Sequence, residues 1–392
     1  MGTTADSVRD RFGFLAGIRD RFEGPNTIGN SRPFWIGFAA VLAVLAVYPF
    51  LPFIGTGSQL SLFLVLAVLG LSLSLVWGYS GVLSFGQVVF FGFGAYTFGV
   101  VSINFPDATG ITGAVVAGVL AGGLGAALMG YFMFYGGVRD VYVTIITLVS
   151  TMVMLTFMSQ TAGSAWTIGE AALGGFNGMP DIPLLTLGIE GVFTFQFVFN
   201  EMQVWLPLFG WNEIDPFYYL SLVAVVGTYF GLRALVNSDF GRVMVAVRED
   251  EDRTRMFGYD VKRAKLLVFT LGGALAGLAG VLYAARNVYI DPTVFELWFA
   301  TLPVVWVSVG GRKSLLGAVI ATVSIEYFRL SIGGDWALVV LGALLLVVIV
   351  ALPGGLVPWV DRQVRRLDVF GESGEAPDPG DAPDAAAEVS DS

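Results

Sequence analysis

The chain has 392 residues, of which 55 % are hydrophobic and 13 % charged, and its formal net charge is −10. A water-soluble protein of this length would carry about a quarter charged residues, so the composition excludes an ordinary soluble domain. The absence of Cys and His excludes disulfides, thiol catalysis and the usual zinc ligands.

Residues 1–33 form a leader without the apolar core of a secretory signal peptide. Its apolar residues recur at helical spacing between charges, and they are Val8, Phe12, Leu15, Ile18 and Phe22. Two readings stay open: a helix lying in the membrane interface, or a polar leader without regular structure.

Residues 34–356 contain apolar runs long enough to cross a hydrocarbon core of about 30 Å. They predict an all-α fold, a polytopic transmembrane helical bundle. The runs at 297–311 and 315–331 are short, so re-entrant geometry there is an open alternative. We expect about ten spans, at 34–54, 60–77, 87–103, 111–134, 141–158, 217–236, 265–284, 297–311, 315–331 and 336–352.

The segment "GYSGVLSFGQVVFFGFGAYTFG", residues 78–99, is apolar but rich in glycine. Glycine costs about 1 kcal/mol per helix position relative to alanine, and polar side chains in a membrane need partners. Anchoring alone does not explain this composition. Ser84 and Gln87 either line a translocation path or form hydrogen bonds between helices.

Residues 159–216 form a long loop with six acidic residues and no Lys or Arg, which we expect to face outward. The final segment, residues 357–392, is rich in Pro, Ala and acidic residues and is expected to be a disordered cytoplasmic tail. We attribute this acidity to solubility in high salt rather than to ligand binding, so the net charge indicates nothing about the substrate.

Residues 237–264 carry the most concentrated charge. Asp239 is positioned to cap a helix with Val243 and Val247 on one face. Glu249 with Arg253, and Glu251 with Arg255, are i, i+4 pairs. Gly258 ends this helix, and Asp260 caps the next. The helix is either a docking surface for a cytoplasmic partner or a solvated connector.

Two further patterns suggest other functions. "GGRKS" at residues 310–314 has Arg where a nucleotide-binding loop needs Gly, so we expect no nucleotide site in this chain. Glu326 and Arg329 lie three residues apart within a span, as a proton relay or, more simply, as a mutually neutralising pair near the outer surface. No nucleophile and base suggest an enzyme.

The distribution of Lys and Arg sets the expected orientation. All but Arg286 and Arg329, of the 21 basic residues, fall on one side of the predicted spans. Both termini are therefore expected in the cytoplasm.

Four blocks resemble the branched-chain amino acid and urea permeases of ABC importers. They are the segment from residue 78, "GRVMVAVREDEDRTRMFGYDVKRAKLLVFTLGGALAGLAGVLYA", "WVSVGGRKSLLGAVIAT" and "LGALLLVVIVALPGGL". The chain is similar to the M-type permease subunit, and "YVTIITL", "GGFNGM" and "VGGRKSLLG" look closest to urea-type members. The resemblance implies the fold of a type II ABC importer permease in the cell membrane.

The resemblance implies roles for several residues. Ser84, Gln87 and Ser314 become candidates for the translocation path. Small residues become helix-packing positions, among them Gly78, Gly81, Gly86, Gly273 and Gly277. Gly81-x-x-Ser84-x-Gly86 is also echoed by Gly311-x-x-Ser314-x-x-Gly317. Contact with an ATPase is expected from Arg248, Glu249, Asp250 and Arg253.

The expected function is therefore the permease subunit of an ATP-driven importer of a small neutral solute, with urea or a short amide ranked ahead of branched-chain amino acids. The implied partners are a second homologous permease subunit, cytoplasmic ATP-binding subunits, a solute-binding protein and membrane lipid, with no nucleic acid and no cofactor. A secondary transporter or channel without an ATPase is the alternative of another class.

Overall fold

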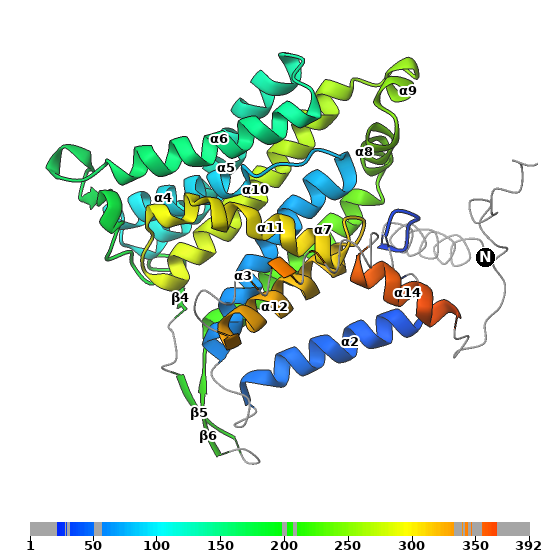
Figure 1. Cartoon of the computed structure of the whole chain (residues 1–392). Coiled ribbons are helices and arrows are strands. Elements are labelled where there is room, and N and C mark those ends of the chain that lie inside the picture. Colours follow the sequence, from blue (N-terminus) through cyan, green and yellow to red (C-terminus); the bar gives the residue numbers. More distant parts are fainter. Residues whose placement is uncertain are drawn as a thin grey trace, which may run out of the picture.

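The protein is a bundle of helices with short β-hairpins at one end (Figure 1). The computed structural model describes residues 22–27, 29, 32–50, 57–197, 202–206, 210–332, 339, 342, 343, 346 and 355–366. Its α-helices are α2 (Arg32–Val47), α3 (Gly57–Leu73), α4 (Gln87–Asn104), α5 (Ala108–Tyr135), α6 (Asp140–Ser159), α7 (Pro216–Val236), α8 (Asp239–Glu249), α9 (Glu251–Met256), α10 (Val261–Asn287), α11 (Leu297–Gly310), α12 (Leu315–Ile332) and α14 (Leu356–Arg366).

Six apolar stretches of the described helices are long enough to cross a membrane: Gln59–Tyr79, Gln87–Asn104, Ala108–Tyr135, Val141–Ser159, Pro216–Val236 and Val261–Asn287. The apolar parts of α2 and α11 are shorter, and α12 carries Glu326 and Arg329. The expected span 336–352 lies outside the described residues except for four isolated positions. The count of ten and the orientation of the termini stay predictions.

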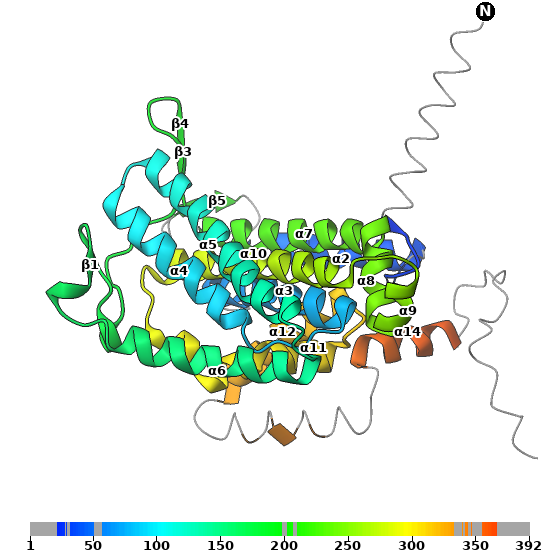
Figure 2. The same cartoon turned by 90° about the horizontal axis from the view of Figure 1, so that it is seen from above.

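Helices α4, α5 and α10 form the most closely packed part of the bundle, and Figure 2 shows them side by side. Between α5 and α10 the backbones nearly touch. A Cβ added to Gly122 would lie 2.6 Å from the Gly273 carbonyl oxygen, and one added to Gly277 would lie 3.0 Å from the Gly118 carbonyl oxygen. A side chain at these positions would separate the helices, so glycine is required for this approach.

Helix α3 is the central helix and contacts α7, α10, α11 and α12. Its apolar residues, such as Val65, Val68 and Leu69, are fully buried. By contrast, α5 and α6 leave large apolar side chains exposed, such as Leu124 at 68 % and Val153 at 59 %. Such a surface is suited to lipid or to another membrane subunit rather than to water.

The acidic segment 159–216 is not only a loop, which corrects the all-α expectation. It contains three antiparallel two-stranded hairpins, β1 (Thr167–Ile168) with β2 (Ala171–Ala172), β3 (Thr186–Ile189) with β4 (Phe193–Gln196), and β5 (Met202–Leu206) with β6 (Gly210–Ile214). In the second hairpin, β4 reads Phe-Thr-Phe-Gln, residue types that favour strands, and Gly191 with φ +80° lies in the turn between β3 and β4.

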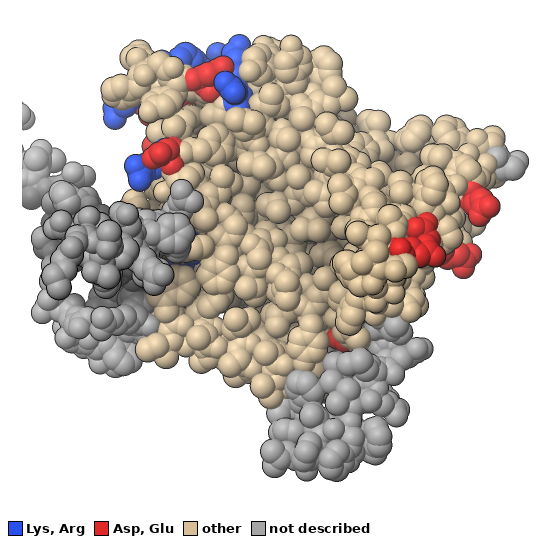
Figure 3. Space-filling model, turned by 180° about the vertical axis from the view of Figure 1, so that it is seen from behind, with Lys and Arg blue, Asp and Glu red and all other residues tan. Residues whose placement is uncertain are grey.

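The two ends of the bundle differ in charge. On the face in Figure 3, Lys and Arg gather at the end that carries α8 and α9, and only acidic residues mark the opposite end. Glu170, Asp181 and Glu190 are exposed at that opposite end.

The chain after residue 355 also differs from expectation. Residues 356–366 form α14, whereas the whole of 357–392 was expected to be disordered. Leu356, Val360 and Val364 recur there at helical spacing between charged residues. The average composition of 357–392 does not reveal this spacing. Residues 367–392, and residues 1–21 of the leader, lie outside the described residues.

Candidate functional site

The strongest candidate site lies where α8 meets the ends of α3, α11 and α12. Helix α8 begins at Asp239 and is preceded by Ser238, whose side chain accepts a hydrogen bond from the Gly241 amide. Ser238, and not Asp239 as expected, is therefore the N-cap; Asp239 lies in the first turn and pairs with Arg242 at 3.2 Å. Ser and Asp are both good N-cap residues, so residue type alone does not distinguish Ser238 from Asp239 as the cap.

The apolar face of α8 holds the helix against the bundle. Val247 is buried with Val261 and Ala264 of α10, and the half-buried Val243 packs on this cluster. Val243 and Val247 thus share one face of α8, as expected, and this face packs on the bundle.

The sequence predicted a single helix through residue 257. This prediction is wrong, because the helix is interrupted at Asp250. Asp250 is extended, with φ −156° and ψ 104°, and its carboxylate accepts a hydrogen bond from the Arg253 amide as the cap of α9. The expected Glu249–Arg253 pair therefore does not form. Arg253 instead lies 3.6 Å from Asp250, because the capping hydrogen bonds turn the chain between the two helices.

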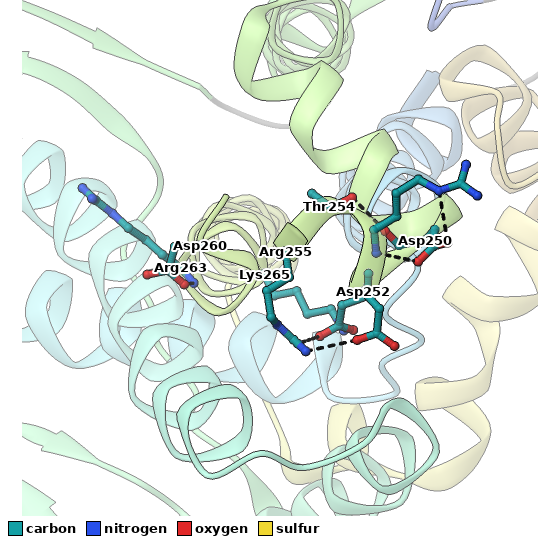
Figure 4. Close-up of polar contacts among 9 residues, drawn as sticks. Asp250, Asp252, Thr254, Arg255, Asp260, Arg263 and Lys265 are labelled. Carbon is teal, nitrogen blue, oxygen red and sulfur yellow. Dashed lines mark hydrogen bonds and ion pairs between the residues drawn. The ribbon is translucent and has the colours of Figure 1, made fainter. Parts of the chain in front are cut away.

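Helix α9 carries its own ion pairs, shown in Figure 4. The Arg255 guanidinium lies 3.0 Å from Glu251, as expected, and 3.1 Å from Asp252. Lys265 of α10, with only 9 % of its side chain exposed, lies 2.6 Å from the other Glu251 oxygen. Gly258 then ends the segment with φ +88°, and Asp260 caps α10, both as predicted.

Arg248, the last basic residue of α8, reaches out of the helix to the end of α3. Its Nη1 donates a 2.6 Å hydrogen bond to the Gly78 carbonyl oxygen. Gly78 lies in the π-helical turn Ser74–Tyr79 that continues α3. Only 16 % of the Arg248 side chain is exposed, so this contact is largely shielded from water.

Glu249 links the same arginine to a second loop. Its carboxylate lies 2.6 Å from Arg248 Nη2 and 3.4 Å from Lys313 Nζ. The hydrogen bond and charge of Arg248, together with the charge of Lys313, lower the pKa of Glu249. Lys313 belongs to the turn between α11 and α12, and its neighbour Arg312 lies over the Trp77 ring at 5.2 Å.

The two loops with echoed Gly and Ser patterns therefore meet at α8. Tyr79 Oη donates to the Lys313 carbonyl oxygen at 3.2 Å. A Cβ on Gly78 would lie 2.0 Å from the Arg312 carbonyl oxygen, so a side chain there would push the loops apart. Gly81, with φ +80°, passes beside Arg248. We call Arg248, Glu249, Gly78 and Lys313 the α8 junction.

Helix α6 holds the loop before α4 from the other side. Thr144 Oγ1 donates to the Leu83 carbonyl at 3.1 Å, and Thr147 Oγ1 accepts from the Phe85 amide at 3.2 Å. Gly86 precedes α4, and a Cβ there would lie 3.1 Å from Thr147. The loop at residues 81–86 is thus fixed between α6 and α8.

The three path candidates are buried and partly satisfied. Ser84 Oγ accepts from the Gly86 amide at 3.1 Å, and Ser314 Oγ accepts from the Gly317 amide at 2.9 Å. Gln87 accepts from Ser72 Oγ at 3.3 Å, a bond between α4 and α3. Among the described residues, the Gln87 Nε2 group has no hydrogen-bond partner.

Glu326 and Arg329 form the expected pair, with Arg329 Nη2 2.7 Å from Glu326 Oε2. Glu326 is fully buried, whereas 28 % of the Arg329 side chain is exposed. Within the described part of the chain, no group of His, Cys, Asp and Glu could hold a metal ion.

Sequence reasoning missed several residues of this region. The Gly78 carbonyl is a backbone group and leaves no signal in the sequence. From the sequence, Lys313 was counted only as a basic residue. Its position within the Gly311-x-x-Ser314 pattern was the available signal for the junction. Arg233, near the end of α7, was also missed. It is buried, donates to the Gly29 carbonyl at 2.8 Å and lies 4.8 Å from the Trp35 ring. These contacts connect α7 with α2 and with the segment before it.

Comparison with known proteins identifies the kind of molecule. Residues 55–349 match the family model described as branched-chain amino acid transport system / permease component. The chain is 31 % identical over 342 residues to the high-affinity branched-chain amino acid transport system permease protein LivM of Escherichia coli, covering 84 % of this chain and 76 % of LivM. No solved structure matches the chain significantly.

More distant relatives extend the comparison. A probable branched-chain amino acid transport permease protein LivM of Methanocaldococcus jannaschii is 24 % identical over 341 residues, covering 74 % of this chain and 90 % of the relative. The ribose import permease protein RbsC of Escherichia coli is 32 % identical, over 22 % of this chain and 28 % of its own length. With six apolar helices able to span a bilayer among the described residues, the chain is a multi-pass protein of the plasma membrane.

Proposed function

The chain belongs to the branched-chain amino acid transport system permease family, and from this premise we propose that it is the M-type permease subunit of an ATP-driven importer of branched-chain amino acids. The relatives that match most of this chain are named for branched-chain amino acid transport. This reverses the ranking that placed urea first. The urea ranking rested on short motifs, whereas the LivM similarity extends over most of the chain.

The proposal includes partners outside this chain. ATP-binding subunits supply hydrolysis, a second permease subunit completes the path, and a solute-binding protein delivers the amino acid. The end with α8 and α9 faces the cytoplasm, because the basic residues gather there. The acidic hairpin end then faces outward and meets the solute-binding protein.

The observation that carries the proposal is the α8 junction. A cytoplasmic helix that only connected two spans would need no contact beyond its apolar face. Here Arg248 and Glu249 join α8 to the ends of α3 and of the α11–α12 pair. A displacement of α8 by an ATP-binding subunit would therefore move both loops together.

The path itself remains part of the proposal. Gln87 is the strongest of the three candidates, because its Nε2 group is buried without a described partner, and a buried donor without a partner costs about 1–3 kcal/mol. A passing substrate or water would satisfy it. Ser84 and Ser314 already accept bonds within their loops.

The alternative class, a secondary transporter or channel, needs a membrane-embedded group that binds and releases a coupling ion. Glu326 is the candidate, but it is already paired with Arg329. Purification of the tagged chain with its associated proteins tests the choice. Recovery of an ATPase whose activity rises with leucine-loaded binding protein supports the importer, and leucine transport by the chain without an ATPase contradicts it.

A further inference from the structure

Helix α14 leaves a row of apolar side chains exposed. Leu356 and Trp359 are each 42 % exposed, and Val360 is 41 % exposed. Positions 356, 359 and 360 share one face, because residues three and four apart are neighbours on a helix. Exposed apolar residues in such a row mark a contact surface.

The other side of α14 is polar by position. At 3.6 residues per turn, Asp361, Arg362 and Arg365 fall opposite Leu356 and Val360, and Arg366 falls at the border. The helix has 11 residues, too few to cross a bilayer. A short helix with one apolar and one basic face is typical of the membrane interface.

The position of α14 agrees with such a location. It contacts α11 and α12, and a Cβ on Gly355, directly before it, would lie 2.2 Å from the Gly311 Cα. Gly311 directly precedes the loop that carries Lys313 of the α8 junction. Figure 1 shows α14 running across the direction of α3 and α10, and a helix at the end of a spanning bundle with this direction lies along the membrane surface.

We propose that α14 is an interfacial helix that binds the phospholipid surface on the α8–α9 side. Leu356, Trp359 and Val360 enter the acyl-chain boundary, where tryptophan is enriched. The three arginines occupy positions on the basic side of the helix, and anionic headgroups attract basic residues near a membrane. The continuity of α14 with the membrane-spanning helices argues for lipid as the occupant.

The chain contains no cysteine, so a single label can be placed without other changes. We would introduce Val360→Cys into the full chain, attach an environment-sensitive fluorophore and reconstitute it in nanodiscs that contain nitroxide-labelled lipid. Met256→Cys, at an exposed position near the end of α9 (87 %), is the solvent control, and Leu124→Cys on α5 (68 %) is the lipid control.

The expected result is quenching at position 360 several-fold stronger than at position 256, and strongest with a nitroxide near the headgroups. Equal quenching at positions 360 and 256 would overturn the proposal. Shielding that appears only when ATP-binding subunits are added would also overturn it, because a protein would then cover the helix.

A second arm tests recognition of anionic lipid. Discs of phosphatidylcholine alone are compared with discs that include phosphatidylglycerol, in the parent chain and in an Arg362→Gln/Arg365→Gln/Arg366→Gln variant. Quenching at position 360 should rise several-fold with phosphatidylglycerol in the parent and not in the variant. The same rise in both would remove the arginines from the proposal.

Discussion

Arg248 of α8 donates a 2.6 Å hydrogen bond to the backbone carbonyl of Gly78, 170 residues earlier in the chain. The acceptor lies in a π-helical turn, a conformation found often at functional sites. The contact therefore joins a charged surface helix to the end of α3, the most buried of the described candidate spans.

Removal of this contact should uncouple transport from ATP hydrolysis. Arg248→Ala leaves the partly buried Gly78 carbonyl without its donor, which costs about 1–3 kcal/mol. We expect a fall in ATP-dependent leucine uptake of roughly tenfold or more, with normal membrane insertion. Uptake into proteoliposomes and ATPase activity are the measurements.

The matched control is Arg242→Ala on the same helix. The Arg242 side chain is 67 % exposed and, within the described part of the chain, forms an ion pair with the exposed Asp239. Such pairs contribute about 0–1 kcal/mol. Equal losses from the two variants would mean that the junction has no special role.

The partner of Glu249 can be identified by double-mutant cycles. Glu249→Gln and Lys313→Gln should be non-additive, because the two charges lie 3.4 Å apart; the coupling should be modest, about 0.2–1 kcal/mol for an exposed pair. Glu249→Gln and Arg253→Ala should be additive. The free energy of unfolding of the purified variants is the measurement for both cycles. Coupling between Glu249 and Arg253, without coupling between Glu249 and Lys313, would support the continuous helix that the sequence predicted.

The junction should tolerate mild acid. Arg248 and Lys313 lower the pKa of Glu249, so its contribution to stability is complete above the ordinary carboxyl pKa of about 4.3 and is lost as the pH falls through the lowered value. The chain has no His to titrate near neutrality. The difference in melting temperature between the parent chain and Glu249→Gln should therefore change little from pH 7 to about pH 5.

The variant Glu249→Gln is the control for this pH dependence. This variant has no carboxylate at position 249 to protonate, so the junction adds no pH dependence to its stability. The melting temperatures of the variant and of the parent chain should therefore converge as the pH falls below the pKa of Glu249. A loss of the parent's stability well above pH 5 that Glu249→Gln abolishes would contradict the lowered pKa.

The contact between α5 and α10 gives a prediction about stability. Gly122→Ala places a methyl group 2.6 Å from the Gly273 carbonyl oxygen, and overpacking of this kind costs about 1–3 kcal/mol. Gly113 lies on the same helix with nothing within 4 Å of an added Cβ. Gly113→Ala should be neutral or stabilising by up to about 1 kcal/mol.

Thermal unfolding in detergent compares the two variants directly. A lower melting temperature for Gly122→Ala, with Gly113→Ala unchanged or higher, is expected. Similar values would mean that the helices move apart at no cost.

The helices were well predicted from the sequence, because long apolar runs have few alternatives in a membrane. The expected span 87–103 ends one residue before α4 does, and the expected span 141–158 is one residue shorter than α6 at each end. The hairpins were missed because their strands have only two to five residues, and α14 was missed because an acidic, proline-rich stretch follows it.

The site was harder to predict than the helices. Apolar spacing correctly placed Val243 and Val247 toward the bundle, but i, i+4 spacing assumed a continuous helix at Asp250, where capping hydrogen bonds prevailed. The partners of Arg248 and Glu249 lie in distant parts of the chain. Such contacts depend on how α3, α8 and α11 pack, which local patterns do not contain.

The central claim is that this chain imports branched-chain amino acids with ATP, through movement of α8. The most direct test is leucine uptake into proteoliposomes that contain the chain with its copurified permease and ATP-binding subunits, with a leucine-loaded binding protein outside and ATP inside. We predict uptake that requires ATP and that falls roughly tenfold or more in Arg248→Ala while the subunits remain associated. Leucine uptake that continues without ATP, or uptake of urea and not leucine, would contradict the account.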